Sequence, residues 1–336
     1  MSITHHGSMD LFAPSRAVCS LAALFVTWKG FLLVVALGAA LAPDYDTSTS
    51  LFLERMYGRN ASVSLATAQL TRWDALYFMH SSIKGHVYEQ EWAFGLGLPT
   101  LVGLVGALAR RLAPSAGPST TTTTTTMSAA TYALEPMVAI CLAHLAHFLA
   151  VLCLHRLTML LSGNPRLAYL SAALHILSPA GLFLSAPYNE GPFACLSFVG
   201  NLLFAVALKS TSGSGRESKS KSRDPSQLSL QRHAAMIAAG LSFGLATAFR
   251  SNGLTSGLLF AVEAVNGLRR MASRPCRAGD AVSVAVALLG GLCVAAGSVV
   301  PQTLAWMRYC VPEGVVSRPW CAWAVPSIYT FVQEHY

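Results

Sequence analysis

The stretch LEPMVAICLAHLAHFLAVLCLHRLTMLL, residues 134–161, decides the fold class of this chain. It is longer than the about 20 residues that an α-helix needs to cross the roughly 30 Å hydrocarbon core of a bilayer. Its Leu, Ala and Val residues do not alternate strictly with polar ones, which favours a helix over a barrel strand. We therefore predict a membrane-spanning helix here.

Similar apolar runs lie on both sides of this stretch. They cover residues 18–41, 92–112, 167–184, 192–208, 234–250, 254–268 and 281–306. The whole chain is 53% hydrophobic and only 11% charged, with a mean hydropathy of +0.49. A soluble domain carries about 25% charged residues. The sequence thus predicts an all-α polytopic membrane protein, with residues 1–336 forming a single membrane domain.

The segments between these runs predict how the chain is oriented. Residues 113–132 and 209–233 are rich in Thr, Ser and Lys, a composition typical of disordered linkers. Basic residues flank spans on the cytosolic side, so Arg110, Arg111 and both linkers are predicted to be cytosolic. The loops 42–91 and 307–336 then face the lumen, where the sequon at Asn60 would accept a glycan.

This count of spans leaves one conflict. If Arg111 and residues 209–233 are both cytosolic, an odd number of crossings must separate Arg111 from residues 185–191, yet two runs, 134–161 and 167–184, lie between them. Either one run is re-entrant, or residues 177–190 enter the membrane and turn back. Non-helical backbone is tolerated at that depth where it lines a cavity.

The net charge of +8 does not indicate a nucleic-acid partner. The Lys and Arg residues lie mainly in short segments between spans, where they set topology, and no basic segment is interleaved with aromatic residues. The eight cysteines include no C-x-x-C pair. Cys310 and Cys321 share one predicted lumenal loop, where they are either free or joined in a disulfide.

One loop segment is dense in chemically active residues: QLTRWDALYFMHSSIKGHVYEQEWAFG, residues 69–95. Asp74 lies beside Trp73 and Arg72. Partial burial would raise the pKa of this carboxyl and a nearby cation would lower it, and such a carboxylate suits general-base catalysis. The alternative is an interfacial helix on which Trp73 marks the headgroup region and Asp74 is a surface charge.

Several blocks of the sequence together resemble one enzyme family. They are PDYDTSTSL (43–51), RWDALYF (72–78), GHVYEQEWAFGLGLP (85–99), SPAGLFLSAPYNEGPF (178–193), AFRSNGL (248–254) and RPWCAWAVPSIYTFVQEHY (318–336). In this order they resemble the GPI mannosyltransferase 2 family. Its members continue past the last block, so the chain resembles a C-terminally incomplete member.

The resemblance implies a fold and an activity. The family is of the GT-C type, a helical bundle in the endoplasmic reticulum membrane, and a sizeable first lumenal loop with short interfacial helices is expected. The reaction would be an inverting transfer of the second mannose, α-1,6-linked, from dolichyl phosphate mannose to mannosyl-glucosaminyl-phosphatidylinositol. Neither a cofactor nor a metal is expected, because the donor carries a single phosphate on a lipid. The family also works with an accessory membrane subunit.

The resemblance further implies roles for individual residues. Asp74 would be the base that deprotonates the acceptor hydroxyl, and Trp73 would position it or stack on the sugar. Arg250 is the candidate for the phosphate, because a guanidinium can grip phosphate oxygens with two hydrogen bonds; the alternative is that it only extends to the membrane interface. Further donor- or acceptor-binding candidates are Asn252, Glu190, Glu89, Gln90, Arg72, Lys84 and His86.

Two other functions remain open at this stage. A lipid or solute transporter would use Glu190 and Arg250 along a path, although such proteins usually contain internal repeats, and the two halves of this chain show none. An inactive scaffold fragment is the second alternative. A large aromatic lumenal loop has no evident use in a transporter, so the enzyme is preferred.

Overall fold

The computed structural model describes residues 14–43, 46–59, 63–112, 133–212, 225–273, 275, 278–311 and 318–335. Over these ranges the chain is helical and contains no β-strand, which confirms the predicted all-α fold. The long helices are α1 (Pro14–Ala39), α6 (Leu134–Ser162), α8 (Glu190–Ser212), α9 (Pro225–Phe249), α10 (Gly257–Ser273) and α11 (Ala278–Tyr309). Among the described residues, α1, α6, α8 and α11 are long and apolar enough to cross a membrane. The protein is therefore a polytopic membrane protein.

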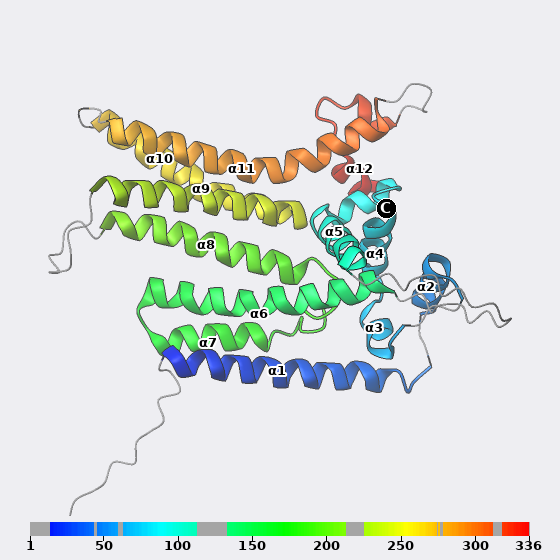
Figure 1. Ribbon diagram of the computed structural model, residues 1–336. Coiled ribbons are helices and arrows are strands. Elements are labelled where there is room, and N and C mark those ends of the chain that lie inside the picture. The colour runs from blue at the N-terminus through cyan, green and yellow to red at the C-terminus, as the bar shows by residue number, and fades with distance from the viewer. Residues whose placement is uncertain are drawn as a thin grey trace, which may run out of the picture.

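These helices pack side by side in a row (Figure 1). The short helix α7 (Pro165–Ile176) lies between α1 and α6, and α9 lies between α8 and α11. Glycines bring α9 and α11 together: a Cβ on Gly297 would lie 2.1 Å from the carbonyl oxygen of Gly244, and one on Gly240 would lie 2.6 Å from Cα of Gly290. Small residues of this kind let membrane helices approach closely.

The two ends of the row differ. One end, here called the loop end, carries α2 (Ser48–Tyr57), α3 (Leu65–Leu70), α4 (Ala75–Lys84), the 3₁₀ helix η1 (Glu89–Phe94), α5 (Gly97–Leu112), the 3₁₀ helix η4 (Pro319–Ala322) and α12 (Ile328–His335). At the opposite end, called the linker end, α8 ends and α9 begins. The short helices expected within residues 42–91 are thus present as α2, α3 and α4.

The prediction of a span over residues 92–112 is wrong. Residues 89–94 form η1, and α5 lies at the loop end beside α4 rather than in the row (Figure 1). The start of α5 touches the last residue of α9, Phe249. Near its other end Arg110 pairs with Glu135 in the first turn of α6, and Glu135 also accepts a hydrogen bond of 2.7 Å from Tyr57 of α2. Both ends of α5 are therefore held at the same end of the bundle.

The predicted span over 167–184 also differs. Helix α7 ends at Ile176, and residues 177–189 continue toward the loop end without helical structure. Lys29, in the middle of α1, donates hydrogen bonds to the carbonyls of Gly181 (3.4 Å) and Leu184 (3.0 Å) and to the Ser185 hydroxyl (2.7 Å). Non-helical backbone is tolerated at membrane depth where it is buried in protein, as residues 184–189 are. The crossing conflict disappears because α5 does not cross. Arg110 and Arg111 lie at the loop end and Lys209 at the linker end, so the prediction that they share one side of the membrane is wrong.

The remaining segments are placed as follows. Helix α8 continues to Ser212 and α9 begins at Pro225, so the linker predicted over 209–233 is too long at both ends; residues 213–224 lie outside the described part, as do 113–132 and Asn60. Within 307–336, α11 extends to Tyr309, and Cys310 forms a disulfide with Cys321. This disulfide joins the end of α11 to η4.

Candidate active site

Asp74 is held at the start of α4 by the packing of that helix. Ala75, Phe78 and Met79 on α4 are buried in one core with Leu98 and Val102 of α5. This core fixes α4 on the loop end of the bundle and leaves the preceding Asp74 at the surface of two cavities.

Trp73 and Arg72 shape the turn before Asp74. Trp73 has a backbone φ of +52°, the one positive φ at a non-glycine residue in the described part of the chain, and its side chain is 61% exposed. Such conformations are uncommon and concentrate at functional sites. Arg72 donates to the Asp46 carbonyl at 3.0 Å and to Gln69 at 3.1 Å, and its own carbonyl accepts from the Tyr188 hydroxyl at 3.0 Å.

A cavity of about 310 Å³ opens where the long helices meet the loop end; we call it the helix-end cavity. Four residues predicted from the sequence line it together: Asp74, Glu190, Arg250 and Asn252. They come from the starts of α4 and α8 and from the segment after α9. The fold therefore brings together three blocks that are far apart in the sequence.

Glu190 and Arg250 form an ion pair in this cavity. Arg250 also lies over the ring of Phe193, 6.0 Å from its centroid. The second carboxylate oxygen of Glu190, Oε2, is buried and makes no hydrogen bond with the described residues. The Arg250 guanidinium, whose side chain is 41% exposed, thus lies next to Glu190 Oε2, an oxygen that can still accept a hydrogen bond.

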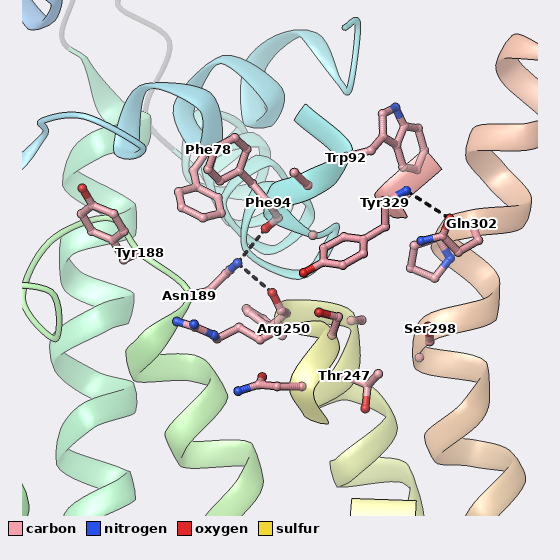
Figure 2. Close-up of a pocket in the computed structure, with 18 of the residues that line it drawn as sticks. Phe78, Trp92, Phe94, Tyr188, Asn189, Thr247, Arg250, Ser298, Gln302 and Tyr329 are labelled. Atoms are coloured by element: carbon pink, nitrogen blue, oxygen red, sulfur yellow. Dashed lines mark hydrogen bonds between the residues drawn. The ribbon is translucent and has the colours of Figure 1, made fainter. Parts of the chain in front are cut away.

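Asn189 is a site residue that the sequence reasoning missed. Its side-chain amide donates to the carbonyls of Phe94 and Phe249, each at 2.7 Å, and so ties the start of α8 to the ends of η1 and α9 (Figure 2). Its Oδ1 atom is buried without a partner among the described residues. Asn189 directly precedes the predicted Glu190, and a neutral amide next to an acid gives little signal by itself.

The far wall of the helix-end cavity comes from α11 and α12, whose contribution was also not foreseen. Gln302 of α11 accepts a hydrogen bond of 3.5 Å from the backbone of Tyr329 in α12, and both side chains line the cavity (Figure 2). Pro301 lies inside α11 and cannot donate a helical hydrogen bond to the carbonyl of Gly297. Gly297 and Pro301 both line the cavity.

A second cavity of about 630 Å³ lies beyond Asp74 and is built by α2, α4 and the start of η1; we call it the loop cavity. Asp74 lines both cavities, whereas Trp73 and Gln90 line only this second one. On its wall His80 pairs with the buried Glu91. The predicted residues are thus divided between two cavities that share one carboxylate.

Other predicted candidates lie elsewhere. Glu89 accepts from the indole of Trp320 at 2.9 Å and lies 3.7 Å from Arg318, so it joins η1 to η4. Lys84 is exposed at the end of α4 and lines neither cavity. His86 is buried against Trp92, with ring centroids 4.8 Å apart.

Burial shifts the titration of two of these groups. Partial burial raises the pKa of Asp74 above the ordinary aspartate value. Burial lowers the pKa of His86, which outweighs the opposing effect of its hydrogen bond to the Gly95 carbonyl. A carboxylate with a raised pKa is a better proton acceptor than an ordinary one, whereas a neutral His86 supplies no charge for a phosphate.

Comparison with known proteins places the chain in an enzyme family. The family model described as Mannosyltransferase (PIG-V) matches residues 21–336. The chain belongs to this mannosyltransferase family. GPI mannosyltransferase 2 of Gibberella zeae is 47% identical, over 96% of this chain and 67% of that protein. The protein of the same name from Chaetomium globosum is 38% identical, over 93% and 67%.

More distant relatives carry a more specific name. GPI alpha-1,6-mannosyltransferase 2 of Cricetulus griseus is 29% identical, over 80% of this chain and 50% of that protein. No solved structure matches the chain. Membership of the mannosyltransferase family makes the protein a glycosyltransferase and answers the choice between enzyme and transporter that the sequence left open.

Proposed function

We propose that this protein transfers the second mannose of the GPI anchor precursor. The donor is dolichyl phosphate mannose, the acceptor is mannosyl-glucosaminyl-phosphatidylinositol, and the new linkage is α-1,6. The names of the relatives support the reaction and the linkage. The single observation that carries the proposal is that Asp74, a potential base, and Arg250, a potential phosphate ligand, line one cavity at the end of apolar helices.

The chemistry is an inverting single displacement. Asp74 takes the proton of the acceptor 6-hydroxyl as that oxygen bonds to the mannose anomeric carbon. The bond from this carbon to the phosphate oxygen breaks on the opposite face, and dolichyl phosphate leaves with the electron pair. Because the donor linkage is β, inversion gives an α product. One positioned base contributes about 10²–10⁴ in rate.

Arg250 stabilises the leaving group. Negative charge grows on the phosphate as the bond breaks, and a preorganised cation aimed at that charge contributes several kcal/mol, roughly 3 for one donor. In this mechanism the phosphate replaces Glu190 as the partner of one Arg250 nitrogen. Glu190 Oε2 and Asn189 Oδ1, both buried without partners among the described residues, accept hydrogen bonds from mannose hydroxyls.

The polyprenyl chain of the donor would bind in an apolar groove next to the helix-end cavity. An apolar groove of about 530 Å³ lies between α5, α6, α8 and α9, and it shares Ala248 and Phe249 with the helix-end cavity. A polyprenyl chain in this groove would bring its phosphate to Arg250 at the end of α9. Burial of apolar surface drives such binding at about 25 cal/mol per Å².

The loop end is the lumenal side in this proposal, and the membrane is that of the endoplasmic reticulum. Basic residues at the linker end, such as Lys209 and Arg270 in the last turns of α8 and α10, fit the cytosolic side. The Cys310–Cys321 disulfide at the loop end fits an oxidising compartment. An accessory membrane subunit remains part of the proposal, without an assigned surface, and no metal or nucleic acid takes part.

The proposal is tested in cells that lack the second GPI mannosyltransferase. The chain or its Asp74→Asn variant is expressed, and membranes are supplied with radiolabelled dolichyl phosphate mannose. We expect the chain to convert the single-mannose precursor into the two-mannose form and the variant to lose about 10²-fold or more in rate. Conversion by Asp74→Asn at the original rate would remove Asp74 as the base. Absence of conversion by the unaltered chain would contradict the proposed reaction.

A further inference from the structure

The loop cavity lies apart from the membrane helices that bind lipid in the proposed function. Its lining comes from α2, α4 and η1, together with the residues just before α4 and η1. It is lined by both polar and apolar surface and shares no residue with the apolar groove. Among the described residues, Asp74 is the one that lines both the loop cavity and the helix-end cavity. A ligand in the loop cavity would therefore contact Asp74 from a different cavity than a ligand in the helix-end cavity.

Three aromatic side chains face this cavity and remain unusually exposed. Trp73 is 61%, Tyr88 58% and Tyr77 40% exposed. Exposed large apolar groups that gather around a concave site mark a binding surface. Two of these rings are held in place, because Tyr77 stacks on Phe94 at 4.7 Å between centroids and Tyr88 stacks on His80 at 5.7 Å. Trp73 has a positive backbone φ of +52°.

Some polar side chains of the loop cavity already have hydrogen-bond partners in the protein, and others can still bind a ligand. Glu91 pairs with His80 and accepts from the Tyr88 backbone at 2.8 Å, so its role is to support the wall. Arg55 is exposed, and within the described part of the chain neither its guanidinium nor the Gln90 amide has a hydrogen-bond partner. A rigid aromatic wall with a free amide and a free guanidinium suits a sugar that carries a phosphate.

We propose that the loop cavity binds the glycan of the acceptor, the mannosyl-glucosaminyl-inositol phosphate head group. This inference rests on the proposed function and deepens it by giving donor and acceptor separate cavities. The apolar faces of the pyranose rings pack on Trp73 and Tyr88, Gln90 binds hydroxyls, and Arg55 faces the phosphodiester. The terminal mannose then presents its 6-hydroxyl to Asp74 from the side opposite the donor.

The reverse assignment fits the structure less well. A donor bound in the loop cavity would have no apolar groove continuous with it for the polyprenyl chain, since that groove joins the helix-end cavity through Ala248 and Phe249. Its phosphate would also be separated from Arg250. The acceptor carries the larger water-soluble part, which suits the larger cavity and its three exposed aromatic side chains.

Binding of the soluble head group tests the inference without turnover. Detergent-solubilised full chain is titrated with mannosyl-glucosaminyl-inositol phosphate, and binding is followed by calorimetry and tryptophan fluorescence. Loss of one aromatic contact of about 1 kcal/mol corresponds to roughly a five- to ten-fold weaker Kd. We expect this for Tyr88→Ala, whereas Tyr88→Phe keeps the ring and stays within about two-fold. Trp73→Phe should remove the fluorescence change.

Matched variants separate this inference from the proposed function. Asn252→Ala, in the helix-end cavity, should leave head-group binding unchanged and raise the KM for dolichyl phosphate mannose, while Tyr88→Ala should raise only the acceptor KM. Head-group binding that Asn252→Ala weakens and Tyr88→Ala does not would overturn the inference, as would absence of binding to a chain whose thermal melt is normal. Binding without any mannose transfer would instead contradict the proposed function alone.

Discussion

At the scale of single residues, Asp74 and Asp46 show how similar carboxylates acquire different properties. Asp46 accepts hydrogen bonds from the backbone and hydroxyl of Ser48, at 2.8 and 2.5 Å, and these lower its pKa. Asp74 has no such bond in the described structure, since it makes no side-chain cap to α4, and partial burial raises its pKa. One carboxylate stabilises its own turn, and the other is left available for a proton.

These opposite shifts predict opposite effects on stability. The pKa of Asp74 is raised in the folded state, so its ionised form destabilises the fold at neutral pH. Asp74→Asn removes this charge. The variant should therefore melt at the same temperature as the unaltered chain or slightly higher, while activity is lost. A lowered pKa contributes stability that is present above the unfolded value and lost as pH falls, so Asp46→Asn should melt lower. Thermal melts in detergent at neutral pH measure both. A lower melting temperature for Asp74→Asn would contradict this account.

The residue scale also shows which site residues a sequence reveals. Glu190 and Arg250 were predicted because a charge within or beside an apolar run is conspicuous, and Asp74 because of its aromatic loop segment and the family resemblance. Asn189, Gln302 and Tyr329 were missed, since uncharged polar side chains in such segments have no distinct pattern. Their role depends on contacts between segments that are distant in the sequence, such as those of Asn189 with Phe249 and Phe94.

At the scale of elements, two predicted spans failed for physical reasons. Arg110 and Arg111 follow an apolar run and resemble a topology signal, but Arg110 pairs with Glu135 of α6. The partner lies across residues 113–132, so the sequence alone does not show it. Residues 167–184 are apolar enough for a span, yet the helix stops at Ile176 and Lys29 binds the next carbonyls. Tertiary contacts override the local pattern in both cases.

Lys29 is therefore expected to hold the non-helical segment 177–189, and with it the start of α8. Lys29→Met keeps the length of the side chain but leaves the carbonyl of Leu184 without its donor, whereas the carbonyl of Gly181 keeps its hydrogen bond from the Ser185 hydroxyl. Each buried acceptor left unsatisfied costs about 1–3 kcal/mol. We expect a lower melting temperature and a higher KM for dolichyl phosphate mannose, measured on solubilised protein.

The matched control for this change is Lys84→Met. Lys84 is exposed at the end of α4 and lines neither cavity, so its substitution should change the melting temperature and the donor KM little. Equal effects of the two substitutions would show that Lys29 has no special role in holding the segment.

At the scale of the whole molecule, the site exists only where distant parts of the chain meet. The helix-end cavity takes residues from α4, η1, α8, α9, α11 and α12. The general fold class followed from the apolar runs, because length and composition are properties of each run alone. The arrangement of the runs, with α5 at the loop end, follows from packing and was not foreseen.

This arrangement predicts which positions share one side of the membrane. Single cysteines replacing Arg111 in α5 and Ser50 in α2, in a chain with its other free cysteines removed, should react from the same side with a membrane-impermeant maleimide. Cysteines replacing Lys209 in α8 and Arg270 in α10 should react only from the opposite side. Labelling of position 111 together with position 209 would contradict the placement of α5 at the loop end.

The position of Asp74 in the wall between the helix-end cavity and the loop cavity has a kinetic consequence. In the proposed assignment, donor and acceptor occupy separate cavities and do not have to pass each other. Each can arrive first, and a spent lipid carrier can depart while the elongated glycan is still bound. The order of events is then set by the concentrations of the two lipids in the membrane rather than by the architecture of the enzyme.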